Sequence, residues 1–187
     1  MENPLNGWDV DAVDEAVEGV REDPESGRLT WRSRVVWDGG FGMDVRTREI
    51  EQLGQGLSRH FTFRGDHPPE LLGGNTGPTA IETLLAALGS CMAGTFAAQA
   101  TVRGVEIDSL EVDVEGDIDL NGFFGLRPVH PGVSDVKLSF RVESDADATV
   151  IGEILDAART HSPVFGSLTR PIEVETVLER PAALSAP

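Results

Sequence analysis

Hydrophobic and polar residues alternate along several short segments of the chain, as in β-strands that bury one face. Two such segments flank a Gly39-Gly40 turn and predict a hairpin over residues 29–48. Because Trp31 and Trp37 lie six residues apart, we place both on one face of its first strand, in core or dimer packing. The same alternation predicts four further strands, at residues 59–64, 110–115, 136–142 and 172–178.

A long central helix is predicted from Thr79 to Val102. Pro78 precedes it, and Thr79 and Glu82 have the spacing of a capping box, in which side chain and backbone groups exchange hydrogen bonds. The residues from 84 to 98 are apolar on almost every face, which is typical of a helix enclosed on all sides. At 15 residues this apolar run is shorter than the roughly 20 that span a bilayer, so we expect no membrane partner.

Two further helices complete the predicted elements. Residues 144–147 begin one that ends at Pro163, and a short amphipathic helix lies within the acidic residues 1–27. Strands precede and follow the two long helices without strict alternation, so the class is α+β with an antiparallel sheet. We therefore expect an acidic N-terminal arm over residues 1–27 and one domain over residues 28–187.

Charge and cysteine content narrow the function. The formal net charge of −17 repels phosphate backbones, so nucleic acid is not an expected partner. The N-terminus lacks the pattern of a secretory signal, and we expect a cytoplasmic location. Because Cys91 is the single cysteine, the chain cannot form an internal disulfide. No metal or other cofactor is predicted, since ligand spacing is missing among the four histidines, which are His60, His67, His130 and His161.

Two segments resemble the OsmC/Ohr family of thiol-dependent hydroperoxide-handling proteins. Residues 68–91, from Pro-Pro-Glu-Leu-Leu-Gly-Gly to Leu-Gly-Ser-Cys91, are similar to the segment that leads into the family's first cysteine. Residues 158–171, which include Thr-His-Ser-Pro, are similar to the segment with its second cysteine, and Ser162 stands at that position. With the flanking strands, the resemblance extends over residues 28–178.

The resemblance implies a fold and a chemistry. The fold would be a curved antiparallel sheet around two central helices, in an intertwined homodimer with the reactive sites near the interface. Cys91 would attack the peroxide as a thiolate, and Glu82 matches the family's glutamate near the start of the cysteine helix. Peroxidase members have an arginine in the turn between their first strands, where this chain has Phe41; Arg34 or Arg46 could replace it.

A thiol of pKa about 8.5 needs a cation or a helix N-terminus to ionise at neutral pH, and Cys91 lies far beyond the first turn of its helix. Because Ser162 cannot form a disulfide, any turnover would require an external thiol reductant. His161, beside Ser162, could polarise a nearby group or simply favour the helix terminus. Glu82 is already explained by the capping box.

Two hypotheses follow. In the first, the protein is a one-cysteine organic hydroperoxide reductase with an activity like that of peroxiredoxins, acting on a small apolar hydroperoxide in oxidative-stress defence. In the second, it is a non-catalytic dimer of the same fold that binds a small apolar ligand, and Cys91 is structural, as a lone cysteine among apolar neighbours often is. Retention of the Cys91 segment favours the first hypothesis, whereas Ser162 and Phe41 favour the second.

Overall fold

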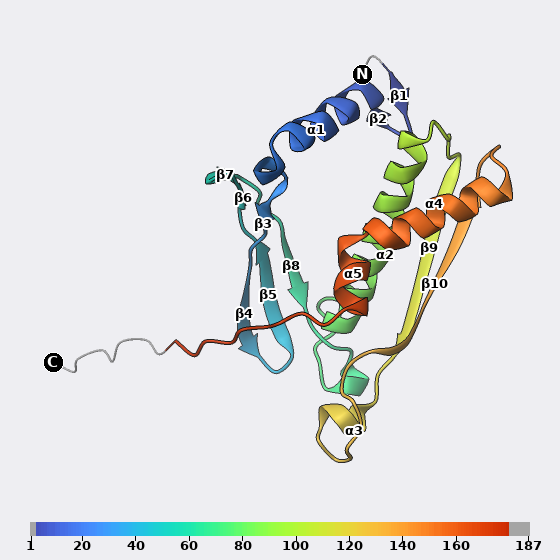
Figure 1. The fold of residues 1–187 in the computed structure, drawn as a ribbon. Coiled ribbons are helices and arrows are strands. Elements are labelled where there is room, and N and C mark those ends of the chain that lie inside the picture. Colours follow the sequence, from blue (N-terminus) through green and yellow to red (C-terminus); the bar gives the residue numbers. More distant parts are fainter. Residues whose placement is uncertain (1–2, 180–187) are drawn as a thin grey trace.

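The structure, a computed structural model, describes residues 3–179 and belongs to the α+β class, as predicted (Figure 1). The helices, with short 3-10 turns labelled η, are α1 (Val10–Glu22), η1 (Pro24–Gly27), η2 (Pro69–Leu71), α2 (Ala80–Val102), α3 (Leu120–Phe123), α4 (Ala148–His161) and α5 (Pro163–Thr169). The strands are β1 (Pro4–Leu5), β2 (Trp8–Asp9), β3 (Leu29–Thr30), β4 (Ser33–Gly39), β5 (Gly42–Thr47), β6 (Ile50–Gln52), β7 (Gln55–Leu57), β8 (Thr62–Gly65), β9 (Ser109–Asp117) and β10 (Ser134–Glu143).

All paired strands among the described residues are antiparallel, in four small sheets. The predicted hairpin is β4–β5, and β8 pairs with β5 as its third strand. Gly39 and Gly40 both have positive φ in the turn, a conformation that glycine adopts without steric cost. One expectation is wrong: Trp31 and Trp37 do not share a strand, because the chain leaves β3 at Thr30 and enters a different sheet at Ser33. Both indoles are about two-thirds exposed and contribute nothing to the core of this chain.

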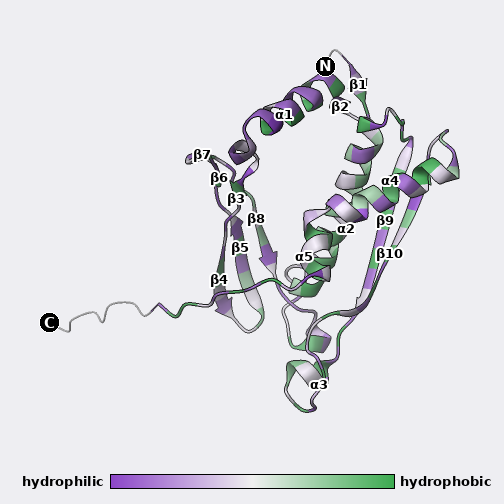
Figure 2. Ribbon diagram, viewed as in Figure 1, coloured by the Kyte–Doolittle hydropathy of each residue, from purple (hydrophilic) through white to green (hydrophobic). Residues whose placement is uncertain are grey.

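The core lies between α2, the β9–β10 pair and the two C-terminal helices. Leu88, Met92 and Phe96 on α2 pack against Ile154 and Ala158 on α4, and all five are buried. In Figure 2, β9 and β10 alternate along their length between hydrophobic and hydrophilic residues, as the sequence pattern indicates. The capping box at the start of α2 is present with both of its hydrogen bonds.

Helix α2 is not enclosed on every side by its own chain, contrary to the expectation from its composition. Its buried residues form one face, whereas Ala86, Ser90 and Gly94 on other faces are exposed. By length and composition alone, this one helix would suffice to cross a membrane. The central helix of a globular fold meets the same two criteria, and α2 packs here against β9, α4 and α5.

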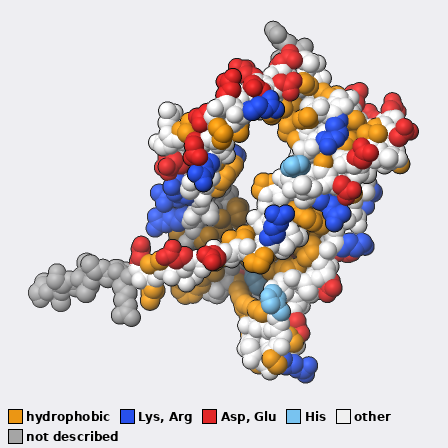
Figure 3. Space-filling model, viewed as in Figure 1, with side chains coloured by type: hydrophobic (Ala, Val, Ile, Leu, Met, Phe, Trp, Pro, Cys, Tyr) orange, Lys and Arg blue, Asp and Glu red, His pale blue; other side chains and the backbone are white. Residues whose placement is uncertain are grey.

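The N-terminal arm is attached to the far end of α2. The Asn6 amide donates to Thr101 Oγ1 at 3.0 Å and to the Val105 carbonyl at 2.9 Å, and its oxygen accepts from the Ile107 N–H. The predicted helix, α1, then runs from this anchor toward β3 and β6. Figure 3 shows an opening through the molecule. It is bordered by α1, by α2 and by the two three-stranded sheets, β3–β6–β7 and β4–β5–β8.

The last predicted strand is absent from this chain. Residues 171–179 are extended, but they pair with no strand among the described residues and run away from α5 past β4 in Figure 1. Val174 and Leu178 are about 80% exposed. The alternating sequence supplies a strand-forming segment, whereas a strand also requires a neighbouring edge that accepts its hydrogen bonds.

Candidate functional site

Cys91 and Ser162 lie together where the α4–α5 corner meets α2. The Ser162 hydroxyl donates a hydrogen bond to Cys91 Sγ at 3.2 Å, across 71 residues of sequence. Cys91 is partly exposed as a residue, while Ser162 is 3% exposed. A buried donor therefore faces the position at which the negative charge of a thiolate would form.

The chain direction at Ser162 is fixed by two helix ends. Its backbone N–H closes the last turn of α4 on the Ala158 carbonyl at 2.9 Å. Its side-chain oxygen accepts from the Phe165 N–H at 3.3 Å and so caps α5, which begins with Pro163, a residue well suited to the first helical position. The serine hydroxyl therefore accepts from α5 and donates to Cys91 at the same time.

The structure does not bring Glu82 or His161 to the sulfur within one chain. Glu82 lies nine residues before Cys91, about 13.5 Å along the helix axis. Its carboxylate accepts from the Thr79 N–H at 2.7 Å, and this bond, first among several causes, lowers the pKa of Glu82. His161 is exposed at the end of α4, and among the described residues no hydrogen bond joins it to Cys91 or Ser162.

The candidate arginines lie on the β4–β5–β8 sheet, across the opening from α2 (Figure 1). Arg34 and Arg46 are exposed and directly opposite each other on β4 and β5, so two like charges are adjacent there. Phe41 stacks on the His67 ring with centroids 4.1 Å apart. No arginine of the described chain forms a hydrogen bond with Cys91.

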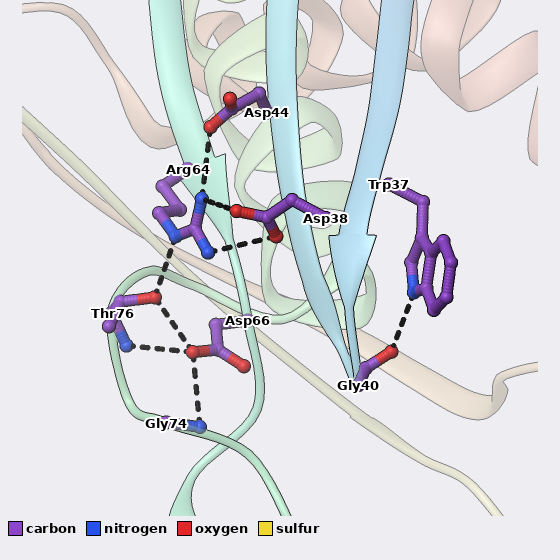
Figure 4. Close-up of polar contacts among 8 residues, drawn as sticks. All are labelled: Trp37, Asp38, Gly40, Asp44, Arg64, Asp66, Gly74 and Thr76. Carbon is purple, nitrogen blue, oxygen red and sulfur yellow. Dashed lines mark hydrogen bonds and ion pairs between the residues drawn. The ribbon is translucent and has the colours of Figure 1, made fainter.

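Sequence reasoning missed a polar network that holds the loop before α2 (Figure 4). Arg64 on β8 contacts both oxygens of Asp38 at 2.8 and 3.0 Å and Asp44 at 3.1 Å, and these aspartates raise the pKa of Arg64. Its Nε donates to Thr76 Oγ1 at 3.0 Å, and Thr76 in turn donates to Asp66 at 2.7 Å. The only signal in the sequence was the concentration of Asp, Gly and Thr around two predicted strands.

Asp66 is the buried centre of that loop, at 5% exposure. The Thr76 hydroxyl, followed by the backbone N–H of His67, lowers the pKa of Asp66 from 3.8 to about 2. The loop is drawn in closely: a Cβ added at Gly73 or Gly77 would lie 1.9 Å from a backbone oxygen, so only glycine fits. Asp66 thus fixes the approach of the chain to the Thr79 cap and the cysteine helix.

Comparison with protein families gives one match. The family model described as OsmC-like protein matches residues 73–177, which include Cys91 and Ser162. The match excludes the N-terminal arm and also residues 28–72, over which the sequence resemblance had been extended. No protein in the curated set matches this chain by sequence.

Solved structures with the same fold share little sequence with this chain. An OsmC-like protein from Mycoplasma pneumoniae has a TM-score of 0.59 and 20% identity over 75% of this chain and 87% of that one. A Psychrobacter arcticus protein, whose name refers to osmotic stress and detoxification, has a TM-score of 0.55 at 17% identity, over 72% and 85% of the two chains. A Vibrio cholerae protein, whose name refers to organic hydroperoxide resistance, has a TM-score of 0.51 at 13% identity, over 73% and 83%. At these identities the likeness shows the fold.

Proposed function

Because this chain belongs to the OsmC-like protein family, we propose that it is a thiol-dependent organic hydroperoxide reductase of a one-cysteine type, acting in oxidative-stress defence. The observation that carries this proposal is the 3.2 Å contact between Ser162 Oγ and Cys91 Sγ. Recognisable family segments contain both residues, and the name of the Vibrio cholerae relative points to the same substrate class.

The first chemical step is attack of the Cys91 thiolate on the peroxide. Sulfur bonds to the terminal peroxide oxygen, the O–O bond breaks, and the alkoxide takes a proton to leave as the alcohol. Cys91 is then a sulfenic acid. The Ser162 hydroxyl donates to the attacking sulfur, and a hydrogen bond to a charged group is stronger than one to a neutral group.

The second step requires a thiol from outside the chain, because Ser162 cannot resolve the sulfenic acid. An external thiol attacks the Cys91 sulfur, water leaves, and a mixed disulfide forms; a second thiol then releases Cys91 as a thiol. The balance is one hydroperoxide and two thiols converted to one alcohol, one disulfide and water. A reducing compartment such as the cytoplasm would supply the thiol.

We propose further that the working unit is an intertwined homodimer. The opening between α1 and α2 and the unpaired residues 171–179 leave a single chain incomplete. A second copy would cover the exposed small residues of α2. It would also offer a place from which Arg34, Arg46 or Glu82 could approach the sulfur of the other subunit.

A second candidate function is a non-catalytic dimer of this fold in which Cys91 is structural. It is favoured by the hydrogen bonds of Ser162, because a buried hydroxyl needs partners and both the Cys91 sulfur and the Phe165 N–H supply them. In that case the sulfur serves only to satisfy a buried serine.

Trapping of the sulfenic acid separates the two functions. Purified protein is mixed with cumene hydroperoxide and dimedone, and the adduct is followed by intact mass. We expect one adduct on the wild type and none on Cys91→Ser. Ser162→Ala should slow its formation about tenfold through loss of the hydrogen bond to the sulfur. Ser167→Ala, which removes a hydroxyl bonded only within α5, is the matched control and should react at the wild-type rate.

Absence of an adduct on the wild type under peroxide excess would refute the reductase proposal. The structural function would then remain, and Cys91→Ala should lower the melting temperature because Ser162 loses its acceptor.

A further inference from the structure

Apart from the Cys91–Ser162 pair, the structure has an apolar cleft of about 760 Å³ between α2, β10 and the α4–α5 corner. Its lining is predominantly hydrophobic, and Leu88 and Met92 at its base are at most 2% exposed. Cys91 does not line it. The volume lies within the range of small-molecule sites, about 300–1,000 Å³.

The ionisable side chains that line this cleft are both basic. They are Arg159 on α4 and His130 in the connection before β10, and both are exposed at the rim. In a chain with 32 acidic and 15 basic residues, a cleft whose lining includes Arg159 and no acidic side chain goes against the overall charge. The cleft therefore combines a rim that attracts a negatively charged group with an apolar interior.

Both basic groups are held in place by neighbours in the cleft wall. The Arg159 guanidinium lies over the Phe165 ring, 5.9 Å from its centroid, and Phe165 is itself part of the lining. His130 Nδ1 accepts from the Gly132 N–H at 3.1 Å, so a neutral His130 carries its hydrogen on Nε2 and can donate there.

Arg159 is only weakly engaged by an acidic neighbour. Asp156 Oδ1 lies 3.4 Å from its Nη1, and the two side chains are 77% and 59% exposed. Exposed ion pairs of this kind contribute little, so a carboxylate ligand could compete for the guanidinium.

We propose that this cleft binds a small amphipathic carboxylate, such as a medium-chain fatty acid. The alkyl chain lies against the accessible apolar side chains of the lining, Leu85, Val136 and Leu168, and the carboxylate meets Arg159 and His130 at the rim. Hydrophobic burial supplies the affinity for the chain, and the basic rim selects the acid over an uncharged molecule of the same length. The proposal concerns a site other than Cys91 and does not depend on its reactivity.

The test compares octanoate with 1-octanol by isothermal titration calorimetry on the full chain. We expect octanoate to bind the wild type more tightly than octanol. Arg159→Gln should weaken octanoate about fivefold, as for a partly solvated charge-assisted bond, and leave octanol unchanged. Asp156→Asn should act in the opposite direction and tighten octanoate, because it removes the competing carboxylate from an exposed position on the same helix.

Arg103→Gln, at the end of α2 and outside the cleft, is the charge-matched control and should change neither affinity. Melting curves establish that each variant folds. The proposal fails if octanoate does not bind the wild type, if octanol binds as tightly, or if Arg159→Gln and Arg103→Gln weaken octanoate equally. Should Arg159→Gln not fold, unchanged octanoate affinity in Asp156→Asn would refute the assignment of the carboxylate to Arg159.

Discussion

The Cys91–Ser162 pair has the arrangement of a two-cysteine site with one sulfur replaced by oxygen. A heavy-atom separation of 3.2 Å across 71 residues places the second side chain where a disulfide partner would stand. The hydroxyl can donate a hydrogen bond to the first sulfur but cannot form a covalent bond to it under physiological conditions. Under the proposed reductase function, the serine keeps the two side chains in contact, and the reducing equivalents would have to come from a thiol outside the chain.

Replacing Ser162 by cysteine should restore an internal disulfide. The side chains are already in contact, and the S–S bond of about 2.05 Å needs only a small approach of the two residues. After mild oxidation with diamide, Ser162→Cys should lose both of its free thiols in an Ellman assay and gain none of the mass of a mixed disulfide. Ser167→Cys, exposed on the next turns of α5, should keep both thiols or form only intermolecular dimers. Two free thiols in oxidised Ser162→Cys would show that the pair does not approach in solution.

The sequence was sufficient to identify the two residues of the candidate site, but not the charged partners that surround other residues. Cys91 and Ser162 could be identified because each lies in a short, recognisable segment. Arg64 could not, because its partners Asp38 and Asp44 are 26 and 20 residues away and meet it only through the register of β4, β5 and β8. Charge partners of this kind follow from strand pairing, which local sequence does not determine.

Among the elements, α2 and the β4–β5 hairpin were predicted correctly, whereas the shortest strands and α5 were missed. The capping box and apolar run determine α2, and the Gly39-Gly40 turn determines the β4–β5 hairpin. Strands of two or three residues, such as β3 and β6, are too short to show a period of two. Helix α5 was missed because Pro163 was interpreted only as the end of α4, whereas proline also favours the first turn of a new helix.

The loop between β8 and α2 has a stability that should depend on pH. The pKa of Asp66 in the folded state, about 2, lies below its ordinary value of 3.8. The carboxylate therefore contributes stability that is fully present above pH 3.8 and is lost as the pH falls toward 2. Asp66→Asn should lower the melting temperature by several degrees at pH 7, because the new amide N–H groups face donors from the loop backbone.

The difference in melting temperature between Asp66→Asn and the wild type should narrow as scanning calorimetry is repeated from pH 5 down to the lowest pH at which both fold. Asp113→Asn is the control, since Asp113 pairs with Arg141 on an exposed strand face and should have almost no effect. A difference that stays constant across this pH range would contradict the assigned role of the Asp66 carboxylate.

The whole molecule exposes more surface than a folded monomer of its mass. The accessible area is 13940 Å² for 20.1 kDa. This is roughly 1.6 times the ~8,700 Å² expected for a monomeric globular protein of that size. The exposed apolar residues include Trp37 and Phe63 on the β4–β5–β8 sheet, and Val174 and Leu178 in residues 171–179. The surplus, about 5,200 Å² per chain, exceeds the roughly 1,000–2,500 Å² that each partner contributes when an obligate dimer buries about 2,000–5,000 Å² in total.

The alternating pattern of residues 172–178 would therefore be explained by a second copy of the chain and not by the fold of one chain. Their alternation predicted a strand, and the single chain offers no edge for it among the described residues. If the segment adds to a sheet of a second copy, its backbone N–H groups are hydrogen-bonded in the dimer and free in the monomer. A proline in the middle of the segment then affects association and leaves the fold of one chain intact.

We expect Val174→Pro to raise the dimer dissociation constant about tenfold or more in sedimentation equilibrium, because it removes a ladder hydrogen bond in each of two symmetric strands. Val174→Thr keeps the β-branched shape and the N–H, and should associate nearly as the wild type does. The far-ultraviolet circular dichroism of Val174→Pro should be that of the wild type at concentrations where both are monomeric. A wild type that remains monomeric at high concentration, or equal dissociation constants for Val174→Pro and Val174→Thr, would show that this segment does not cross to a second copy. If the wild type remains monomeric, Arg34 and Arg46 would also not reach Cys91, since within one chain they lie on the opposite side of the opening.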